Sequence, residues 1–332
     1  MSDQASAPTP APADPTVICA GVVVADHLCS PIDHLPAAGE LVPAERMVLN
    51  IGGCATNAAV VLSKLGVRAE VCGRVGDDPF GRFIAETLRG HGVEPAGLRV
   101  DPARPTSQSL IINVRGEDRR FVHTFGANEG FAAEDLDAAS RPDRATPKVL
   151  YLGGFGVLPG LDHDALAERF ARARERGTMT VLDVVIPGPG DYLPMVRAVL
   201  PHVDVFLPNV DEAALILGTA DPVRQAFAFR DMGARRVVVT RGGHGAIVVS
   251  DALRVRVGTY PVDCVDATGG GDAFDSGYIA GLVDGLPELA CLHLASALGA
   301  SCVRSVGTTD GTFARPEADA FIAAHELPVD PF

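Results

Sequence analysis

The sequence predicts an α/β protein with a mainly parallel central sheet, helices on both faces of that sheet, and a small β-sheet lid. From about residue 148 onward, short β-branched runs alternate with amphipathic helical patterns, as in parallel sheets that are buried between helices. In the first half, two irregular segments at about 26–50 and 98–125 interrupt this alternation and are candidates for the lid. A chain of 332 residues is long enough to bury a large core.

The first elements follow a tail. Residues 1–16 begin with an Ala- and Pro-rich stretch that lacks the basic start and apolar core of a secretory signal, so we expect a disordered tail. A buried-type strand is expected at 17–25, and a helix at 55–65 that ends at Gly66. In the second irregular segment, two strand patterns at 107–114 and 119–125 flank Gly116-Glu117-Asp118 and predict a β-hairpin.

The second half alternates strand and helix. Strands are expected at 148–152, 178–183, 203–206 and 236–240, with helices at 162–176, 211–217 and 222–232. The 162–176 helix has acidic residues in its first turns, arginines in its last turns and Gly177 after it, as helix dipole and capping effects favour. A further strand at 246–249 follows a glycine turn, and a final apolar helical pattern begins near residue 273 and ends at Gly285. Ligands bind beyond the carboxyl ends of the strands in such sheets.

Composition narrows the class of protein. The net charge of −14 argues against a nucleic acid or an anionic membrane as partner, and no apolar run approaches the roughly 18 residues that span a bilayer. The seven cysteines are odd in number and include no Cys-x-x-Cys pair, which favours reduced thiols in a cytoplasmic protein. The nine histidines show no zinc-ligand spacing.

The most informative motif is the glycine loop at 266–274, with the sequence Asp-Ala-Thr-Gly-Gly-Gly-Asp-Ala-Phe. Gly269, Gly270 and Gly271 let backbone N–H groups crowd around a ligand, and the start of the following helix favours an anion there. Asp272 would repel a phosphate, but it suits a base that takes a proton from an attacking hydroxyl. The motif matches neither a Walker loop nor a dinucleotide loop. Taken alone, Asp272 could also simply complement the helix dipole.

Two further sites offer polar groups to a polyol. Asp26 directly follows the first strand and can accept hydrogen bonds from hydroxyls, although an ordinary loop aspartate is the alternative. Gly52 and Gly53 permit close backbone approach, and Asn57 can both donate and accept. The alternative for this second group is a helix cap.

Two more motifs lie at expected strand ends. Asn209 with Glu212 is a capping-box variant, and Glu212 could equally hold a hydrated magnesium ion near phosphates. The stretch from Thr240 to Gly245 contains Gly242 and Gly243, and by itself it indicates a glycine hairpin turn.

Taken in order, these segments resemble the ribokinase-like carbohydrate kinase family, of the phosphofructokinase-B type. The resemblance is carried by residues 21–26, 35–40, 52–57, 73–81, 126–128, 208–212, 240–242 and 266–272, and it spans about residues 17–315. The regions 52–57 and 266–274 are the most specific. The resemblance implies a ribokinase-like three-layer α/β/α sandwich with a small β-sheet lid, and a kinase domain over residues 17–332.

The resemblance also implies an activity and a set of site residues. The activity is ATP-dependent transfer of the γ-phosphoryl group to a hydroxymethyl group of ribose, fructose or a related sugar, with Mg²⁺ and with K⁺ as an activator. In the implied site, Asp272 is the base, the anion hole is formed by Gly269, Gly270 and Gly271, and the sugar is bound by Asp26, Gly52, Gly53 and Asn57. The nucleotide is bound by Asn209, Glu212, Thr240, Gly242, Gly245 and Ser296. Glu212 also holds magnesium through water, and the monovalent cation is bound by Asp266, Thr268, Val303 and Val306.

Departures from the family pattern leave the substrate open. Ribokinases usually carry Lys where this chain has Cys54, and they tend to place Glu at the end of the strand that includes residues 151–154 here. A ketohexose, a sugar acid or a nucleoside is therefore a candidate beside ribose. No basic cluster marks the expected sugar pocket, although Arg119 and Arg120 lie on the expected hairpin. A nucleoside kinase and a non-catalytic sugar- or nucleotide-binding regulator are the alternatives, and a homodimer through the lid is a further expectation.

Overall fold

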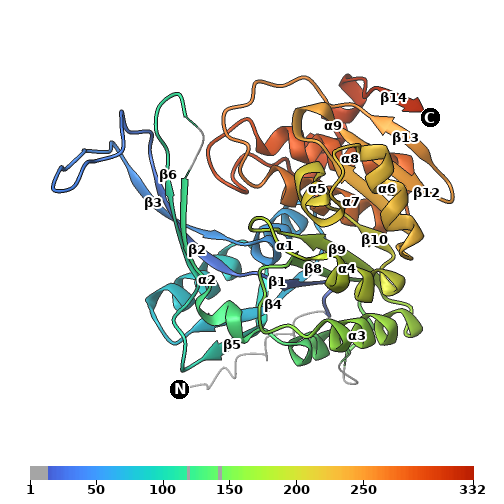
Figure 1. The fold of residues 1–332 in the computed structure, drawn as a ribbon, viewed down its shortest axis with the longest axis horizontal. Coiled ribbons are helices and arrows are strands. Elements are labelled where there is room, and N and C mark those ends of the chain that lie inside the picture. The colour runs from blue at the N-terminus through green and yellow to red at the C-terminus, as the bar shows by residue number, and fades with distance from the viewer. Residues whose placement is uncertain (1–13, 118–119, 141–143) are drawn as a thin grey trace, which may run out of the picture.

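The central sheet of the computed structural model has ten strands. The structure describes residues 14–332 except 118–119 and 141–143, so most of the expected tail, residues 1–13, lies outside the described residues. The strand order is β14-β13-β12-β11-β10-β9-β8-β1-β4-β5, parallel from β11 to β5 and antiparallel from β11 to β14 (Figure 1). The bounds are β1 (Val17–Gly21), β4 (Ala69–Gly76), β5 (Glu94–Asp101), β8 (Val149–Phe155), β9 (Met179–Val184), β10 (Val205–Phe206), β11 (Arg236–Thr240), β12 (Ala246–Ser250), β13 (Arg254–Val257) and β14 (Val329–Pro331).

Helices cover both faces of this sheet, as the sequence predicts. Along β1, Val17 and Cys19 belong to one apolar cluster, whereas Ile18 and Ala20 belong to another. The first cluster includes residues of α1 (Cys54–Lys64), α2 (Pro79–Gly90), α7 (Gly270–Val283), α8 (Glu288–Cys302) and α9 (Arg315–Ala324). The second includes residues of α3 (His163–Glu175), α4 (Leu193–Val199), α5 (Val210–Leu217) and α6 (Pro222–Asp231). The alternation along a strand therefore produces a three-layer α/β/α sandwich.

The expected strand at 17–25 is wrong as a single strand. It divides into β1 and β2 (Val24–Cys29), and β2 leaves the central sheet. Gly21 has φ +122, and a Cβ there would lie 2.1 Å from the carbonyl oxygen of Gly153, so the backbones approach closely at the break. The Asn128 carboxamide accepts from the Val23 amide at 3.3 Å and donates to the Val23 carbonyl at 3.0 Å, which satisfies the backbone between the two strands.

A second, small sheet projects from the left side of the molecule in Figure 1. Its order is β3 (Met47–Gly52), β2, β6 (Gln108–Ile112) and β7 (Arg120–Thr124); the two outer pairs are antiparallel and β2–β6 is parallel. The predicted hairpin is confirmed as β6 and β7, while Asp118 and Arg119 at its turn lie outside the described residues. Residues 98–101, at the start of the second expected lid segment, belong to β5 of the central sheet.

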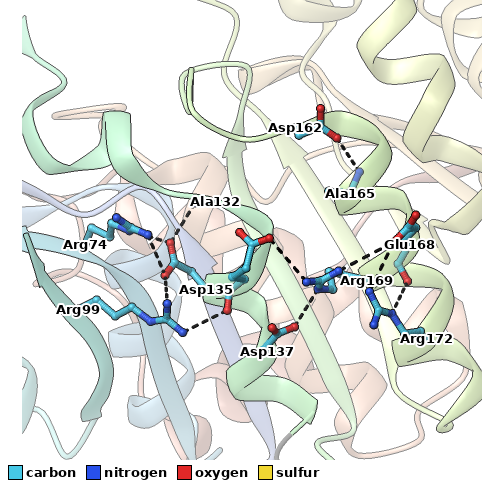
Figure 2. Close-up of polar contacts among 11 residues, drawn as sticks. Arg74, Arg99, Ala132, Asp135, Asp137, Asp162, Ala165, Glu168, Arg169 and Arg172 are labelled. Atoms are coloured by element: carbon cyan, nitrogen blue, oxygen red, sulfur yellow. Dashed lines mark hydrogen bonds and ion pairs between the residues drawn. The ribbon is translucent and has the colours of Figure 1, made fainter.

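A buried carboxylate fixes η2 (Ala133–Ser140) against the central sheet. The Asp135 side chain is fully buried and accepts from Arg74 on β4 at 2.8 Å, from Arg99 on β5 at 3.0 Å and from the Ala132 amide at 2.9 Å (Figure 2). Figure 2 also shows Arg169 of α3 reaching Asp137 of the same segment. The two arginines and the amide offset the cost of burying the Asp135 charge.

The other predicted elements of the second half are present. The helix expected at 162–176 is α3, and the Asp162 side chain caps it by accepting from the Ala165 amide at 2.8 Å. The glycine turn between β11 and β12 is a hairpin connection that contains η4 (Gly242–His244). In the described ranges, no helix has both the length and the apolar character that are needed to cross a bilayer.

Candidate active site

Asp272 lies in the first turn of α7, directly after the glycine loop. Gly269 is the N-cap with φ +77, and a Cβ there would lie 2.6 Å from the carbonyl oxygen of Thr308. A side chain at Gly271 would enter open space. The first i to i−4 bond of α7 runs from the Ala273 amide to the Gly269 carbonyl at 2.9 Å, so the preceding amides belong to the part of a helix that lacks intrahelical acceptors. These amides and the helix dipole suit an anion.

Two groups from the start of α1 contact Asp272. Asn57 Nδ2 donates to Asp272 Oδ2 at 2.8 Å, and Cys54 Sγ lies within 4.8 Å of a carboxylate oxygen of Asp272. Burial raises the pKa of Asp272, and the hydrogen bond from Asn57 partly opposes that shift. Asn57 is itself buried, and its Oδ1 has no hydrogen-bond partner among the described residues. The fold thus brings the predicted base, Asp272, into contact with one predicted sugar-binding residue, Asn57, which is far from it in the sequence.

An acidic residue that the sequence reasoning missed lies beside this pair. Asp183 lies near the end of β9, and its side chain reaches Cys54 and Asp272. Three atoms lie within 4.8 Å of one another: Cys54 Sγ, one carboxylate oxygen of Asp183 and one of Asp272. Asp183 Oδ2 accepts from the Gly154 amide at 3.1 Å. Burial raises the pKa of Asp183, and the charges of Glu212 and Asp272 add to the shift. A carboxylate from β9 therefore reaches the end of β8, where the family pattern would place Glu.

Asp275 is a second acidic group that was not predicted. It lies one turn after Asp272 on α7, is buried, and accepts from the Tyr151 hydroxyl at 3.4 Å. Burial is the largest cause that raises the pKa of Asp275, and the charges of Asp183 and Asp272 raise it further. The site thus concentrates negative charge, and a cation or a proton would stabilise it.

Asp26 of β2 lies over Gly52 of β3. A Cβ at Gly52 would be 1.8 Å from Asp26 Oδ2, so glycine is required there while the carboxylate keeps its position. Burial raises the pKa of Asp26 to about 6; a hydrogen bond from Ser109 lowers it, and the charge of Asp272 raises it. Gly53 is the N-cap of α1 with φ +93, and a Cβ there would lie 2.4 Å from the Val22 carbonyl oxygen. The predicted sugar-binding residues Asp26, Gly52, Gly53 and Asn57 therefore cluster at the small sheet and the start of α1.

The predicted nucleotide residues gather at the ends of β10 and β11. The capping box is present: Asn209 Oδ1 accepts from the Glu212 amide at 2.8 Å, and Glu212 Oε2 accepts from the Asn209 amide at 2.9 Å. Burial raises the pKa of Glu212 to about 7, partly opposed by backbone hydrogen bonds, and the charge of Asp272 adds to the shift. An isolated parallel bridge pairs Asn209 with Thr240.

The glycine turn after Thr240 needs two of its glycines. Gly242 has φ +52 and Gly245 has φ +79, and a Cβ at Gly245 would lie 1.9 Å from the carbonyl oxygen of Val257. Ser296 is buried on α8. Among the described residues, no hydrogen bond joins Ser296 to Thr240 or to this turn, so the structure does not bring it into the group by direct contact.

The predicted cation loop is compact. Asp266 Oδ1 accepts from the Thr268 amide at 2.9 Å and from the Thr268 hydroxyl, and Oδ2 accepts from the Gly307 amide at 3.3 Å. The Val303 carbonyl accepts from the Val265 and Asp266 amides at 2.8 and 3.2 Å. The Val306 side chain is exposed, and its carbonyl belongs to the trans peptide unit whose N–H reaches Asp266, so this carbonyl points away from the Asp266 carboxylate. The loop thus places the Asp266 and Thr268 oxygens near Gly269, but it does not place the Val306 carbonyl beside them.

Solved structures share this fold. The structure of Arabidopsis thaliana ribokinase complexed with ribose and ATP has a TM-score of 0.79 and 23% identity, and the match covers 93% of this chain and 99% of that chain. A ribokinase structure from Thermotoga maritima has a TM-score of 0.75 and 22% identity, with 93% and 99% covered. The class that the fold defines is therefore the ribokinase-like α/β sandwich, as predicted.

Sequence comparisons reach the same family. The model described as pfkB family carbohydrate kinase matches residues 17–314. A 2-dehydro-3-deoxygluconokinase from Thermoproteus tenax is 28% identical over 293 residues, 83% of this chain and 86% of that protein. A Mus musculus ribokinase is 29% identical over 267 residues, 78% of this chain and 79% of that protein. The chain belongs to the pfkB family of carbohydrate kinases, and it is an ATP-dependent carbohydrate kinase.

Proposed function

We propose that this kinase transfers the γ-phosphoryl group of ATP to a hydroxymethyl group of a monosaccharide, with Asp272 as the general base. The observation that supports this most strongly is the position of Asp272. It lies half-buried at the start of α7, beside a glycine loop that suits an anion, and Asn57 from α1 holds its carboxylate. A base in that position can reach a hydroxyl that attacks a phosphoryl group held at the helix start.

The chemistry follows from this placement. As the sugar oxygen attacks the γ-phosphorus, its proton passes to an Asp272 carboxylate oxygen, and the bond from phosphorus to the bridging oxygen breaks to release ADP. Burial raises the pKa of Asp272, so this carboxylate holds a proton more strongly than an exposed one. The Gly270 amide donates to the Ala267 carbonyl at 3.3 Å, so we assign mainly the Gly271 amide to the negative charge that develops on the phosphoryl oxygens.

The sugar side of the site is assigned to Asp26, Gly52, Gly53 and Asn57. Asp26 is buried and accepts hydrogen bonds, so it suits two sugar hydroxyls. Asn57 Oδ1 is a buried acceptor without a partner among the described residues, and Nδ2 fixes the amide against the base. Closing the small sheet over the sugar would exclude water and suppress phosphoryl transfer to water.

The nucleotide side is assigned to Asn209, Glu212, Thr240, Gly242 and Gly245, with Ser296 as a further residue inferred from the family resemblance alone. The carboxylates of Glu212, Asp183 and Asp272 offer hard oxygen ligands and excess negative charge, and this set fits a hydrated Mg²⁺ held through Glu212. When bound, Mg²⁺ neutralises charge on the phosphates.

We propose a monovalent cation at the Asp266 loop from the family resemblance. The carboxylate of Asp266 and the hydroxyl of Thr268 lie on a segment that packs against Gly269, whereas the Val303 carbonyl already accepts from two amides and the Val306 carbonyl points away from Asp266. K⁺ bound there would order the glycine loop, because Gly269 contacts the Thr308 backbone of the same segment.

The names of the relatives support a range of sugars and related substrates. They include a ribokinase, a 2-dehydro-3-deoxygluconokinase and an aminoimidazole riboside kinase of Salmonella typhimurium, the last 26% identical over 294 residues. We propose ribose, fructose or a related monosaccharide, a reducing compartment such as the cytoplasm, and a homodimer through the small sheet. Met47 and Val122, which the strand register places on the face opposite Asp26, are 67% and 63% exposed, which favours a partner surface on that face.

The direct test is a coupled assay of ADP release over a panel of pentoses, hexoses, sugar acids and nucleosides, with product identified by mass. We expect sugar-dependent ADP release together with a phosphorylated sugar. Release of ADP at the same rate without any acceptor, or phosphorylation of nucleosides alone, would contradict the assignment.

A further inference from the structure

One of the two lysines of this chain, Lys64, is the last residue of α1 and contacts a segment that follows α8. Lys64 Nζ donates to the Thr309 carbonyl, to the Asp310 carbonyl at 3.3 Å and to the Thr312 hydroxyl at 3.2 Å. The Thr312 hydroxyl gives its own proton to the Thr309 carbonyl at 2.7 Å, so it is free to accept from the lysine. An ammonium has three N–H donors, and these three oxygens match them. Lys64 therefore ties residues 307–312, here called the support segment, to the end of α1.

The support segment packs against the glycine loop. A Cβ on Gly269 would lie 2.6 Å from the Thr308 carbonyl oxygen and 2.7 Å from the Thr308 Cα, so the two backbones are in direct contact. Cys302 Sγ lies 3.2 Å from the Thr308 carbonyl oxygen and 3.4 Å from the Thr268 carbonyl oxygen, and it thus bridges the two segments. Because Gly269 is the N-cap of α7, a shift of the support segment would move the first amides of that helix.

The start of α1 contacts the candidate base. Asn57 Nδ2 donates to Asp272 Oδ2 at 2.8 Å, and α1 packs against α7. Lys64 follows Asn57 by about two helical turns, roughly 10 Å along the axis of α1. The helix therefore holds the base at one end and, through the support segment, the glycine loop at the other. The base and the amides that suit an anion share one rigid frame.

We propose that Lys64 is a positioning residue for phosphoryl transfer, which holds the support segment against Gly269 and so keeps the Gly271 amide directed at the transferred group. This inference rests on the proposed function. Among the described residues, every hydrogen bond of Lys64 Nζ goes to the support segment. Lys64 therefore acts through that segment and not by contact with a substrate.

Loss of this ammonium should lower kcat more than it weakens binding. Negative charge on the phosphoryl oxygens develops during transfer, so a displaced Gly271 amide destabilises the transition state more than the bound ground state. Removal of one such donor costs about 10²- to 10³-fold in kcat. Here the donor is displaced and not removed, so we expect a loss of about 10-fold, below that range. KM for the sugar and KM for ATP should stay close to the wild-type values.

The test compares Lys64→Met, Lys64→Arg and a matched lysine variant. Methionine keeps most of the length of the side chain and removes all three donors, whereas arginine keeps the charge and places its donors in a planar fork. Lys148 Nζ donates to the Val283 carbonyl at 2.8 Å, at the opposite end of α7, so Lys148→Met is the control. We expect kcat to fall about 10-fold in Lys64→Met, to fall less in Lys64→Arg, and to stay at the wild-type value in Lys148→Met.

Hydrogen exchange followed by mass spectrometry tests the positioning without any substrate. Peptides that cover residues 266–272 and 307–313 should exchange faster in Lys64→Met than in the wild type, because the support segment loses its link to α1. The same peptides should exchange at the wild-type rate in Lys148→Met. A merely structural role of Lys64 would lower the melting temperature but leave both the exchange of 266–272 and kcat, measured well below that temperature, unchanged.

The two possible failures are distinguishable. A wild type that phosphorylates no sugar contradicts the proposed function, on which this inference rests. With an active wild type, the inference alone is overturned if Lys64→Met keeps its kcat, if its loss lies in KM instead, or if residues 266–272 exchange as in the wild type. An equal loss of kcat in Lys148→Met would overturn it as well.

Discussion

Gly52→Ala provides a sharp test of the sugar site, because the change adds one methyl group directly beneath Asp26. The new Cβ would lie 1.8 Å from Asp26 Oδ2 and 2.5 Å from its Cγ. Non-bonded atoms need about 3.5 Å, so the carboxylate must move by about 1.5 Å or more. The backbone of Gly52 is not among those with positive φ, so alanine itself is tolerated there and the displaced carboxylate is the main effect.

The size of the effect follows from the hydrogen bonds that move with Asp26. A hydrogen bond to a charged group contributes about 1.5–3 kcal/mol, and each 1.4 kcal/mol is a factor of ten. Gly52→Ala and Asp26→Ala should each lower kcat/KM for the sugar by about 10- to 100-fold and leave KM for ATP almost unchanged. The double variant should be little worse than Asp26→Ala, because the clash needs both groups.

The assay is ADP release with sugar varied at saturating ATP, together with thermal unfolding of all four proteins. Equal losses from Gly52→Ala in the wild type and in the Asp26→Ala protein would refute the reasoning. So would a fall in melting temperature with unaltered sugar kinetics, which would make Asp26 a loop-capping residue and remove it from the site.

Three further predictions concern stability and ions. Asp135→Ala leaves Arg74 and Arg99 without their buried acceptor and should lower the free energy of unfolding by about 3–5 kcal/mol in urea titrations. The Asp137 side chain is 52% exposed, so Asp137→Ala should lower it by less than about 1 kcal/mol. Equal losses in the two variants would contradict this prediction. Burial raises the pKa of Glu212 from 4.5 to about 7, so the contribution of this group to stability is complete below pH 4.5 and is lost as pH rises through 7. Glu212→Gln keeps a capping side chain and should raise the melting temperature at pH 8 but not at pH 4. A lower melting temperature of this variant at pH 8 would refute the prediction. Potassium should raise kcat through the Asp266 loop, and equal rates in potassium and in a bulky organic cation at matched ionic strength would remove the cation from the account.

The sequence predicts those parts of the site whose signal is local. The glycine loop with Asp272 and the capping box of Asn209 and Glu212 are short motifs, and the structure places both at the starts of helices. The strand break at Gly21 was missed because the apolar run continues through Ala25. Only the close approach to the Gly153 backbone, far away in sequence, reveals it.

Other residues enter the site only through the fold. Asp183 ends a strand that was predicted, so the rule that ligands bind beyond strand carboxyl ends was the one signal that could have identified it. Ser109 lies opposite Asp26 through the register of β2 and β6, and no spacing in the sequence encodes that register. The order of the small sheet, with β2 parallel to β6, brings them together.

The central claim is that Asp272 is the base, and Asp272→Asn tests it most directly. Asparagine keeps the size of the side chain and removes its ability to take a proton. The account predicts that kcat falls at least about 10²-fold, while the dissociation constant for ATP, measured by calorimetry, and the melting temperature stay close to those of the wild type. A variant that binds ATP normally and turns over sugar at a near-normal rate would contradict the account.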